Sequence, residues 1–383
     1  MVLLNHSYSQ EKILILCMGI LLLSESASAD SLSFFNPNDI TKHPNHLSIN
    51  TQTLLANDAF SLEGLFDDFH GDFHHQRSDY FAVGDIRYDV GTYIDGLGYV
   101  GYTYRKEAVI ETSSDTMLLV NQASNDLDLT LGKQYNLGLE IEGFEVHGVM
   151  FANSISVYEK NGWNIRLGGA VELLYGTETQ HGNVSGDASA VNESDYDFTL
   201  HSRYLYTENY LYELDVDRVT SYGYTTHISL FSRYNDFSLS VIVNDISGKL
   251  YWKNLPYSDV NMASGNKSYD ENGYVKYAPV ISGIERTTKF TQTLMKKWRI
   301  EGAYILDEGL LQLGSDHIYS TYLPYVKYTH HFENEVIASA SYESYFDMVG
   351  VDIAYKYYHL GVHTNGLIEP SALKINLGMH YTF

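Results

Sequence analysis

The C-terminal end of the chain alternates between apolar and polar side chains at every position. The apolar positions are Leu373, Ile375, Leu377, Met379, Tyr381 and Phe383. The positions between them hold Lys374, Asn376, Gly378, His380 and Thr382. Successive side chains of a β-strand point to opposite faces, so this segment predicts a strand with one apolar and one polar face, closed by an aromatic residue. Water-soluble proteins rarely end in this way.

The other end of the chain predicts export. Residues 13–23 form an apolar run that is followed by the small residues of an Ala-x-Ala cleavage site before Asp30. We therefore interpret residues 1–29 as a cleaved signal peptide. A membrane anchor is the alternative, but the run is shorter than the roughly 20 residues that a spanning helix needs. Lipidation at Cys17 is a further alternative, although Leu16 stands where a small residue is expected.

The terminal strand and the signal peptide together resemble Gram-negative outer-membrane β-barrel proteins as a class. The resemblance implies insertion into the outer membrane with the help of the barrel-assembly machinery, and contact with outer-membrane lipid and lipopolysaccharide. Its assembly signal falls on Ile375, Leu377, Met379, Tyr381 and Phe383. The solute and the oligomeric state stay open.

Alternating segments recur along the chain after the signal, as in residues 163–175 and 220–234. No uninterrupted apolar segment is long enough for a helical span, and a closed barrel crosses a membrane with about 10 alternating residues per strand. We expect an all-β antiparallel transmembrane barrel of about 14 strands, within 12 to 16, because bacterial barrels use even numbers. The candidate strands lie near residues 80–90, 97–106, 116–121, 126–133, 136–142, 144–157, 163–175, 196–207, 209–219, 221–234, 236–248, 276–292, 296–306, 318–331, 334–346, 349–359 and 371–383.

Tyrosine is abundant, with 34 residues, and many tyrosines lie near the ends of the alternating segments. Aromatic rings with a polar tip settle at the membrane–water boundary, so most of these residues predict the two girdles of a barrel. Lining of the lumen or stacking on sugars is the alternative. Short turns at 234–236 and 333–334 indicate the periplasmic end, and the polar stretches 176–195 and 254–273 indicate external loops.

Residues 30–79 do not show a sustained alternation and hold Pro37 and Pro44. We assign them to a mostly irregular segment that is either a plug in the lumen or a periplasmic arm, and residues 80–383 to the barrel. The His- and Asp-rich stretch 67–75 has no defined metal-ligand spacing, so its role stays open and we expect neither a metal nor a cofactor.

The formal net charge is −24, which argues against nucleic acid as a partner, because binding to phosphates requires clustered Lys and Arg. Charges of both signs recur opposite the apolar stripes and predict the lining of a lumen. The candidates are Arg166, Glu172, Arg203, Glu213, Asp215, Asp217, Arg233, Lys297, Arg299, Glu301, Glu335, Glu343, Asp352, Lys356 and Lys374.

A lumen with these charges predicts a water-filled or gated pore for small polar solutes or ions, and unpaired acids at Glu213, Asp215 and Asp217 would favour cations. A structural or assembly barrel with a filled lumen is the alternative, because lumen charges can also pair with each other. An outer-membrane hydrolase is less well supported. Residues 361–366 resemble the His-x-Ser-Asn-Gly stretch of outer-membrane phospholipase, but Asn365 stands where the nucleophilic Ser is needed, so we expect no enzyme activity.

Overall fold

The structure, a computed structural model, describes residues 33–40, 46–74, 79–208, 217–264, 267–269, 275–277, 280–333 and 335–382. The expected signal peptide, the acids Glu213 and Asp215, and the terminal Phe383 lie outside these ranges. The helices in the described part are α2 (Pro37–Ile40), α3 (Leu62–Phe66) and α4 (Ser114–Ser124). None of them is long and apolar enough to cross a membrane.

Strands dominate the molecule, and 17 of them belong to one antiparallel sheet. Those of the N-terminal half are β1 (His46–Asn57), β2 (Asp79–Ile94), β3 (Gly98–Ser113), β4 (Gln134–Lys160), β5 (Trp163–Asn192), β6 (Asp195–Tyr206), β7 (Ser221–Tyr234) and β8 (Phe237–Asn244). The others are β9 (Lys249–Ala263), β12 (Val280–Thr293), β13 (Lys297–Leu306), β14 (Gly309–Ile318), β15 (Thr321–His331), β16 (Val336–Glu343), β17 (Met348–Tyr355), β18 (Tyr358–Thr364) and β19 (Ala372–Thr382). A separate small hairpin consists of β10 (Lys267–Tyr269) and β11 (Val275–Tyr277).

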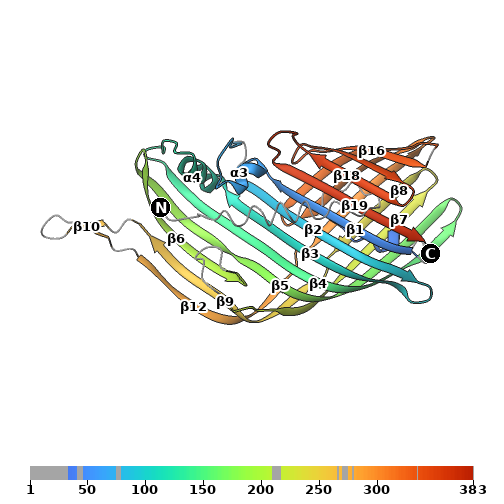
Figure 1. Ribbon diagram of the computed structural model, residues 1–383, viewed down its shortest axis with the longest axis horizontal. Helices are drawn as coiled ribbons and strands as arrows, with labels where there is room; N and C mark the ends of the chain where they lie inside the picture. The colour runs from blue at the N-terminus through green and yellow to red at the C-terminus, as the bar shows by residue number, and fades with distance from the viewer. Residues whose placement is uncertain are drawn as a thin grey trace.

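The sheet closes on itself through β1, which pairs antiparallel with β19 on one side and with β2 on the other. From β2 the pairing passes through β3, β4 and β5 to β7 and β8, and then from β13 in chain order to β19. This ring confirms the expected closed antiparallel barrel (Figure 1).

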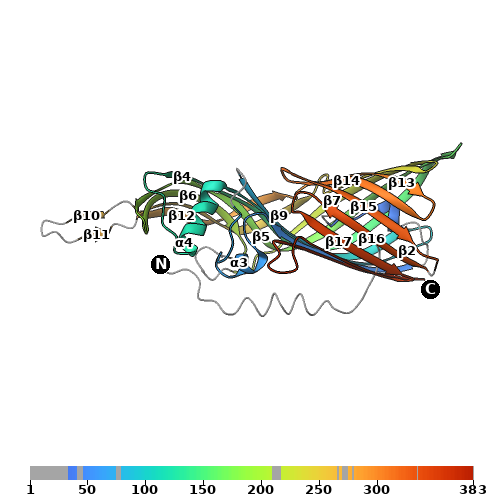
Figure 2. The same cartoon turned by 90° about the horizontal axis from the view of Figure 1, so that it is seen from above.

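Beyond one end of the ring the sheet continues as an extension. Residues 163–176 of β5 pair with β7, whereas residues 180–192 pair with β6, which in turn pairs with β9, and β9 with β12. β6 and β7 lie end to end along β5, and β8 and β9 lie end to end along β7. β12 and β13 pair with β9 and β8 in the same way. The extension projects to the left in Figures 1 and 2.

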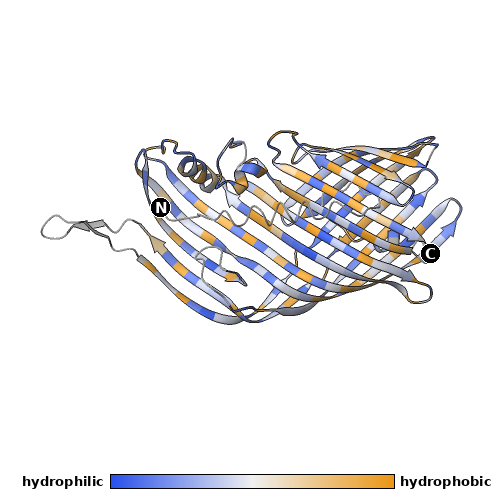
Figure 3. Cartoon of the chain, in the orientation of Figure 1, coloured by the Kyte–Doolittle hydropathy of each residue, from blue (hydrophilic) through white to orange (hydrophobic). Residues whose placement is uncertain are grey.

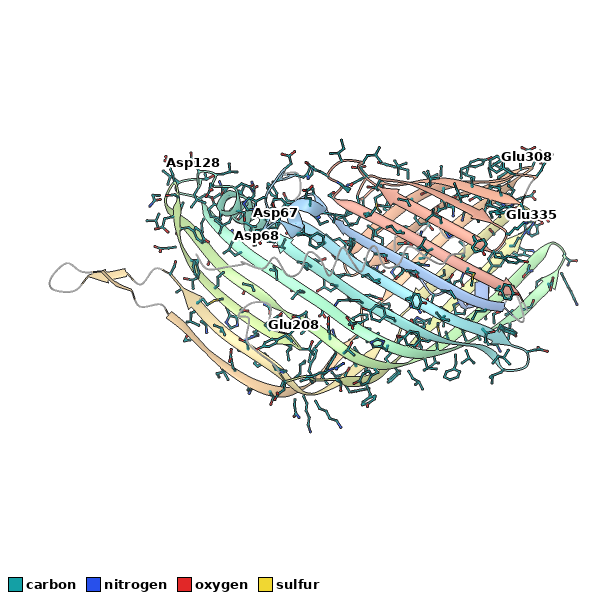
Figure 4. All side chains as sticks on the ribbon, in the orientation of Figure 1. Asp67, Asp68, Asp128, Glu208, Glu308 and Glu335 are labelled. Atoms are coloured by element: carbon teal, nitrogen blue, oxygen red, sulfur yellow. The ribbon has the colours of Figure 1, made fainter. Side chains whose placement is uncertain are left out.

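The strands of the ring have one buried and one exposed face. Hydrophilic and hydrophobic residues alternate along them (Figure 3). Along β17, Val349, Val351 and Ile353 are more than half exposed, whereas Asp352 between them is 1% exposed. The C-terminal strand follows the same rule, with Lys374 and Asn376 buried and Tyr381 exposed. Polar residues therefore face the interior and apolar residues face outward, as expected for a barrel in lipid.

Aromatic pairs mark both edges of the exposed apolar belt. At the end with the short turns, ring centroids lie 4.6 Å apart for Trp163 and Tyr234 and 4.7 Å apart for Phe237 and Tyr304. At the other edge Tyr175 and Tyr222 lie 5.4 Å apart. These aromatic pairs lie at the two levels where the girdles are predicted.

The orientation follows from the connections. The turns 95–97, 161–162, 235–236, 307–308 and 356–357 are all at the end where β1 begins and β19 ends. Short connections are typical of the periplasmic side, and the other side carries α4 and the connections 207–220 and 264–279. These connection lengths predict that the extension lies on the external side.

Several predicted boundaries were wrong. Residues 46–57, assigned to a plug or arm, form β1, because paired neighbours on both sides compensate for a weak alternation. Residues 116–121 are helical in α4, since the hydroxyl of Ser113 caps the helix by accepting the Thr116 amide. Most of 176–195 and 254–263 is strand in the extension, where both faces meet water and polar residues are tolerated.

Arginine substitutions test where lipid ends. Val351→Arg places a charge on the belt and should lower the free energy of unfolding by about 2–4 kcal/mol in lipid vesicles. Ile284→Arg changes a residue that is also exposed, at 61%, but lies on β12 of the extension, so it should have little effect. Denaturant titration of the folded protein in vesicles measures both; equal losses would contradict the placement of the extension in water.

Candidate functional site

The interior of the ring holds a cluster of buried charges, which we call the lumen charge cluster. Its members are Asp85, Arg87, Asp89, Arg105, Glu107, Glu172, Asp245 and Lys297, each at most 6% exposed. They come from β2, β3, β5, the break after β8, and β13, so the cluster reaches across the ring.

Glu172 on β5 is the centre of the cluster. Its two carboxylate oxygens accept from Arg87 Nη2 at 2.6 Å and from Arg105 Nη1 at 3.2 Å. The Nε2 atom of His227 lies 3.2 Å from the same carboxylate. A carboxylate that is shared by two guanidinium groups ties β5 to β2 and β3 through the lumen.

The remaining cations connect more distant walls. Arg105 donates to both oxygens of Asp245, at 2.9 and 2.7 Å, and to Glu107 at 2.8 Å. Lys297 on β13 donates to Asp85 of β2 at 3.1 Å and to Glu107 of β3 at 2.9 Å. At this level the interior is crossed by ion pairs rather than by open solvent.

The N-terminal segment 33–40 lies inside the ring against this cluster, and we call it the lumen segment. The Ser33 amide donates to Asp85 Oδ2 at 3.0 Å, and the Ser33 hydroxyl donates to the other oxygen of Asp85. The side-chain amide of Asn244 binds the backbone of Phe35 twice, accepting from its N–H at 2.9 Å and donating to its carbonyl at 3.0 Å. The Asn244 side chain therefore makes the two hydrogen bonds to the Phe35 main chain that a neighbouring β-strand would make.

The aromatic side chains of the lumen segment lie against arginines. The guanidinium carbon of Arg299 lies 4.3 Å from the ring centroid of Phe34, and that of Arg87 lies 5.3 Å from the ring of Phe35. Both phenylalanines are buried, at 7% and 4% exposure. Cation–π contacts of this kind are favourable in a site that excludes water.

Glycine at position 168 makes room for the helix α2, which begins at Pro37. A Cβ at Gly168 would lie 2.7 Å from Pro37 Cβ and 3.0 Å from the Asn38 backbone nitrogen. Pro37 suits the first helical position, where its missing N–H costs no hydrogen bond. The inner face of β5 is therefore shaped for this part of the chain.

A second polar cluster lies on the inner face of β16, β17 and β18. Asp352 Oδ1 is 3.3 Å from His359 Nε2 and 3.2 Å from His363 Nε2, and Asp352 Oδ2 accepts from Ser339 at 3.1 Å. The carboxylate passes over Gly361, where a Cβ would lie only 2.0 Å from it. In the same way the His363 ring passes over Gly350 and reaches the Ser341 hydroxyl at 3.3 Å.

Ser341, His363 and Asp352 thus form a hydrogen-bonded chain that the sequence did not reveal, although His363 was considered there without a partner nucleophile. The three residues are 9%, 5% and 1% exposed. Their strands pair on both sides, so their backbone amides are engaged in the ladder and do not form an oxyanion hole. The arrangement holds three strands together.

The structure places the predicted lumen residues in three groups. Inside the ring lie Arg166, Glu172, Lys297, Arg299, Glu301, Glu343, Asp352 and Lys374. Outside the ring lie Arg203, which is on β6 of the extension, Asp217 in the connection before β7, and Arg233, Glu335 and Lys356 at the short turns. Glu213 and Asp215 are outside the described residues, so the expected acid run stays a prediction.

Sequence reasoning missed Asp85, Arg87, Asp89, Arg105, Glu107 and Asp245. The signal was present in part, because residues 85, 87 and 89 of β2 and residues 105 and 107 of β3 are charged at every second position. These strands also carry tyrosines on the outer face, and the alternation was used only to place strands. Asp245 lies in a break of the sheet, where no periodicity points to it.

The His- and Asp-rich stretch packs through its aromatic residues. Phe69 and Phe73 lie with ring centroids 5.7 and 5.2 Å from that of Phe60. Within the described residues, no three His, Cys, Asp or Glu side chains are arranged to hold a metal ion.

Comparisons with known proteins give fold-level likenesses. No protein-family model and no curated protein sequence matches the chain. Among solved structures, a deltaS2 mutant of the TodX monoaromatic hydrocarbon channel is similar, with a TM-score of 0.37, 10% identity, and coverage of 90% of this chain and 91% of that one. The CymD monoaromatic hydrocarbon channel gives a TM-score of 0.24, 7% identity and 96% coverage of both chains. The Escherichia coli outer-membrane protease OmpT gives 0.23, 8% identity, and coverage of 93% and 100%.

The lumen charge cluster should dominate stability. Glu172→Gln leaves Arg87 and Arg105 without their shared carboxylate and should lower the free energy of unfolding by about 3–5 kcal/mol, as for a broken buried ion pair. Glu178 binds Lys106 at 2.7 Å but is 35% exposed. Glu178→Gln should therefore change the free energy of unfolding by only about 0–1 kcal/mol. Denaturant titration in vesicles compares the two variants. Similar losses of unfolding free energy would contradict a stabilising role of the lumen charge cluster.

Proposed function

We propose that the protein is a gated channel of the Gram-negative outer membrane, closed in this structure by its own lumen segment. The closed ring, the outward apolar belt and the two girdles support the membrane location. The observation that carries the gating is the binding of Ser33 and Phe35 inside the ring, by Asp85 and Asn244. Export through a cleaved signal peptide of residues 1–29 and insertion by the barrel-assembly machinery belong to the same proposal.

The lumen segment, residues 33–40, acts as a plug in this proposal, whereas the periplasmic-arm alternative leaves it outside the lumen. Its contacts are individually modest, since a net hydrogen bond contributes about 0.5–1.5 kcal/mol. A plug held by several such bonds can leave and return without unfolding of the barrel, because the strands that close the ring keep all of their own partners.

The permeant class follows from the charges that remain when the plug leaves. The lumen charge cluster combines the cations Arg87, Arg105 and Lys297 with the five carboxylates named above. The acidic excess favours small cations or neutral polar solutes over anions. The candidates Arg166, Arg299, Glu301 and Asp352 line the same interior and set local preference along the path.

Channel recordings test the proposal. In a planar bilayer the wild-type protein should open rarely, and Asn244→Ala should raise the open fraction about 10- to 30-fold, because the plug loses two hydrogen bonds. Gly168→Leu should act in the same direction by displacing α2. Gly302→Leu is the matched control, since a Cβ at Gly302 meets no atom within 4 Å.

The alternative is a structural or assembly barrel whose lumen stays filled. Silence of the wild type and of both plug variants, with normal heat-modifiable mobility as proof of folding, would contradict the channel and favour this alternative. Openings that prefer anions would contradict the role given to the carboxylates.

A further inference from the structure

The outer face of the barrel carries a basic patch at the level of the external girdle, formed by Lys249, Lys253 and Lys289. Lys249 and Lys253 alternate with Tyr251 along β9, and all three side chains are exposed. Lys289 on β12 is exposed as well, while its neighbour Phe290 packs toward the core. The three lysines therefore point outward from two paired strands.

A β-bulge brings two of these lysines together. The pairing of β9 with β12 shifts between Thr288 and Phe290, so that Lys253 and Asn254 both lie opposite Lys289. Asn254 takes a positive φ of 57°, the usual sign of a bulge or tight turn. Two like charges across one pair of strands destabilise the sheet unless an anion lies between them.

The height of the patch matches the headgroups of the outer leaflet. Tyr251 pairs with Tyr222, and Lys249 pairs with Tyr224, at the start of β7. These tyrosines form the external girdle with Tyr175, where the hydrocarbon ends. Lys249 lies one step from this girdle toward the periplasm, whereas Lys253 and Lys289 lie one step beyond it on the external side. The two lysines of the bulge therefore lie at the level of lipid phosphates.

A cavity of about 750 Å³ adjoins the patch. It lies where β6 ends and β7 has not yet begun, and its cationic lining residues are Arg218, Lys253 and Arg286. Tyr206, Tyr222, Tyr251 and Tyr257 supply aromatic walls, and Asp217 and Glu285 are the carboxylates. The guanidinium carbon of Arg286 lies 5.2 Å from the ring centroid of Tyr257, which fixes its position.

Several other cations of this acidic chain are paired with carboxylates. In the lumen Arg87, Arg105 and Lys297 are paired, and on the surface Lys106 binds Glu145 and Glu178. For Lys249, Lys253 and Lys289, no described residue supplies a carboxylate within ion-pair distance.

We propose that the basic patch and its cavity bind the phosphate groups of a phosphorylated glycolipid of the outer leaflet. A phosphate monoester carries up to two negative charges and three acceptor oxygens, which suits the Lys253–Lys289 pair and Arg218. The sugar part of the headgroup fits against the tyrosine walls. The inference rests on the membrane location in the proposed function, and it is independent of channel activity.

Binding of lipid A to the full-length protein in detergent tests the site. Reversing both lysines of the bulge, Lys253→Glu with Lys289→Glu, should weaken binding at least about tenfold, equivalent to about 1.4 kcal/mol. Lys160→Glu with Lys356→Glu is the matched control, because both residues are exposed at the periplasmic turns. The control should bind as the wild type does.

Dephosphorylated lipid A and inorganic phosphate separate the sources of binding. Removal of the phosphates from the lipid should reproduce the loss seen in the double variant, and inorganic phosphate at millimolar concentration should displace little lipid. Full displacement of the lipid by inorganic phosphate would overturn the assignment of a lipid ligand and favour free phosphate. Unchanged lipid binding by the double variant, shown to be folded by its heat-modifiable mobility, would overturn the site. Channel recordings of the same variant should match the wild type.

Discussion

The pairing of β1 with both β2 and β19 is the constraint on which the rest of the structure depends. A sheet in hydrocarbon has no water for its edge groups, so it must close, and closure creates an interior shielded from lipid. The alternation along each strand then sends every second side chain into that interior. Buried charges there are stabilised by ion pairs, and the ion pairs of the lumen charge cluster link walls that are distant along the ring.

The lumen segment depends on this interior. Asp85 and Lys297 lie on opposite walls and meet at Ser33, so the segment completes a network that the barrel strands begin. Asn244 gives the Phe35 backbone the hydrogen bonds that it would have in a sheet, and Gly168 leaves the volume that α2 needs. In the proposed channel, stability and closure therefore involve the same groups, and gating would displace the lumen segment without breaking the ion pairs beneath it.

The sequence predicted the architecture because its signals are local. The two faces of residues 373–382 and the charge alternation of the strands each follow from the surroundings of a single strand, and the structure confirms both. Glu172, Lys297, Arg299 and Asp352 were found in this way. The partners of Glu172 were not, because contacts across the lumen join residues far apart in the chain. Strand β1 and the extension were missed where polar residues pair without an apolar face to reveal them, and α4 was missed because a capped apolar run of this length resembles a strand.

Photo-crosslinking from position 35 in intact outer membranes tests most directly whether the segment occupies the lumen. A benzophenone amino acid in place of Phe35 should crosslink within the chain to peptides of β3 or β7, because Tyr99 and His227 lie with ring centroids 5.9 and 6.0 Å from Phe35. Crosslinks of this kind, found by mass spectrometry in the folded barrel, are the predicted result. Crosslinks only to periplasmic proteins, with none to the inner face of the barrel, would contradict the account.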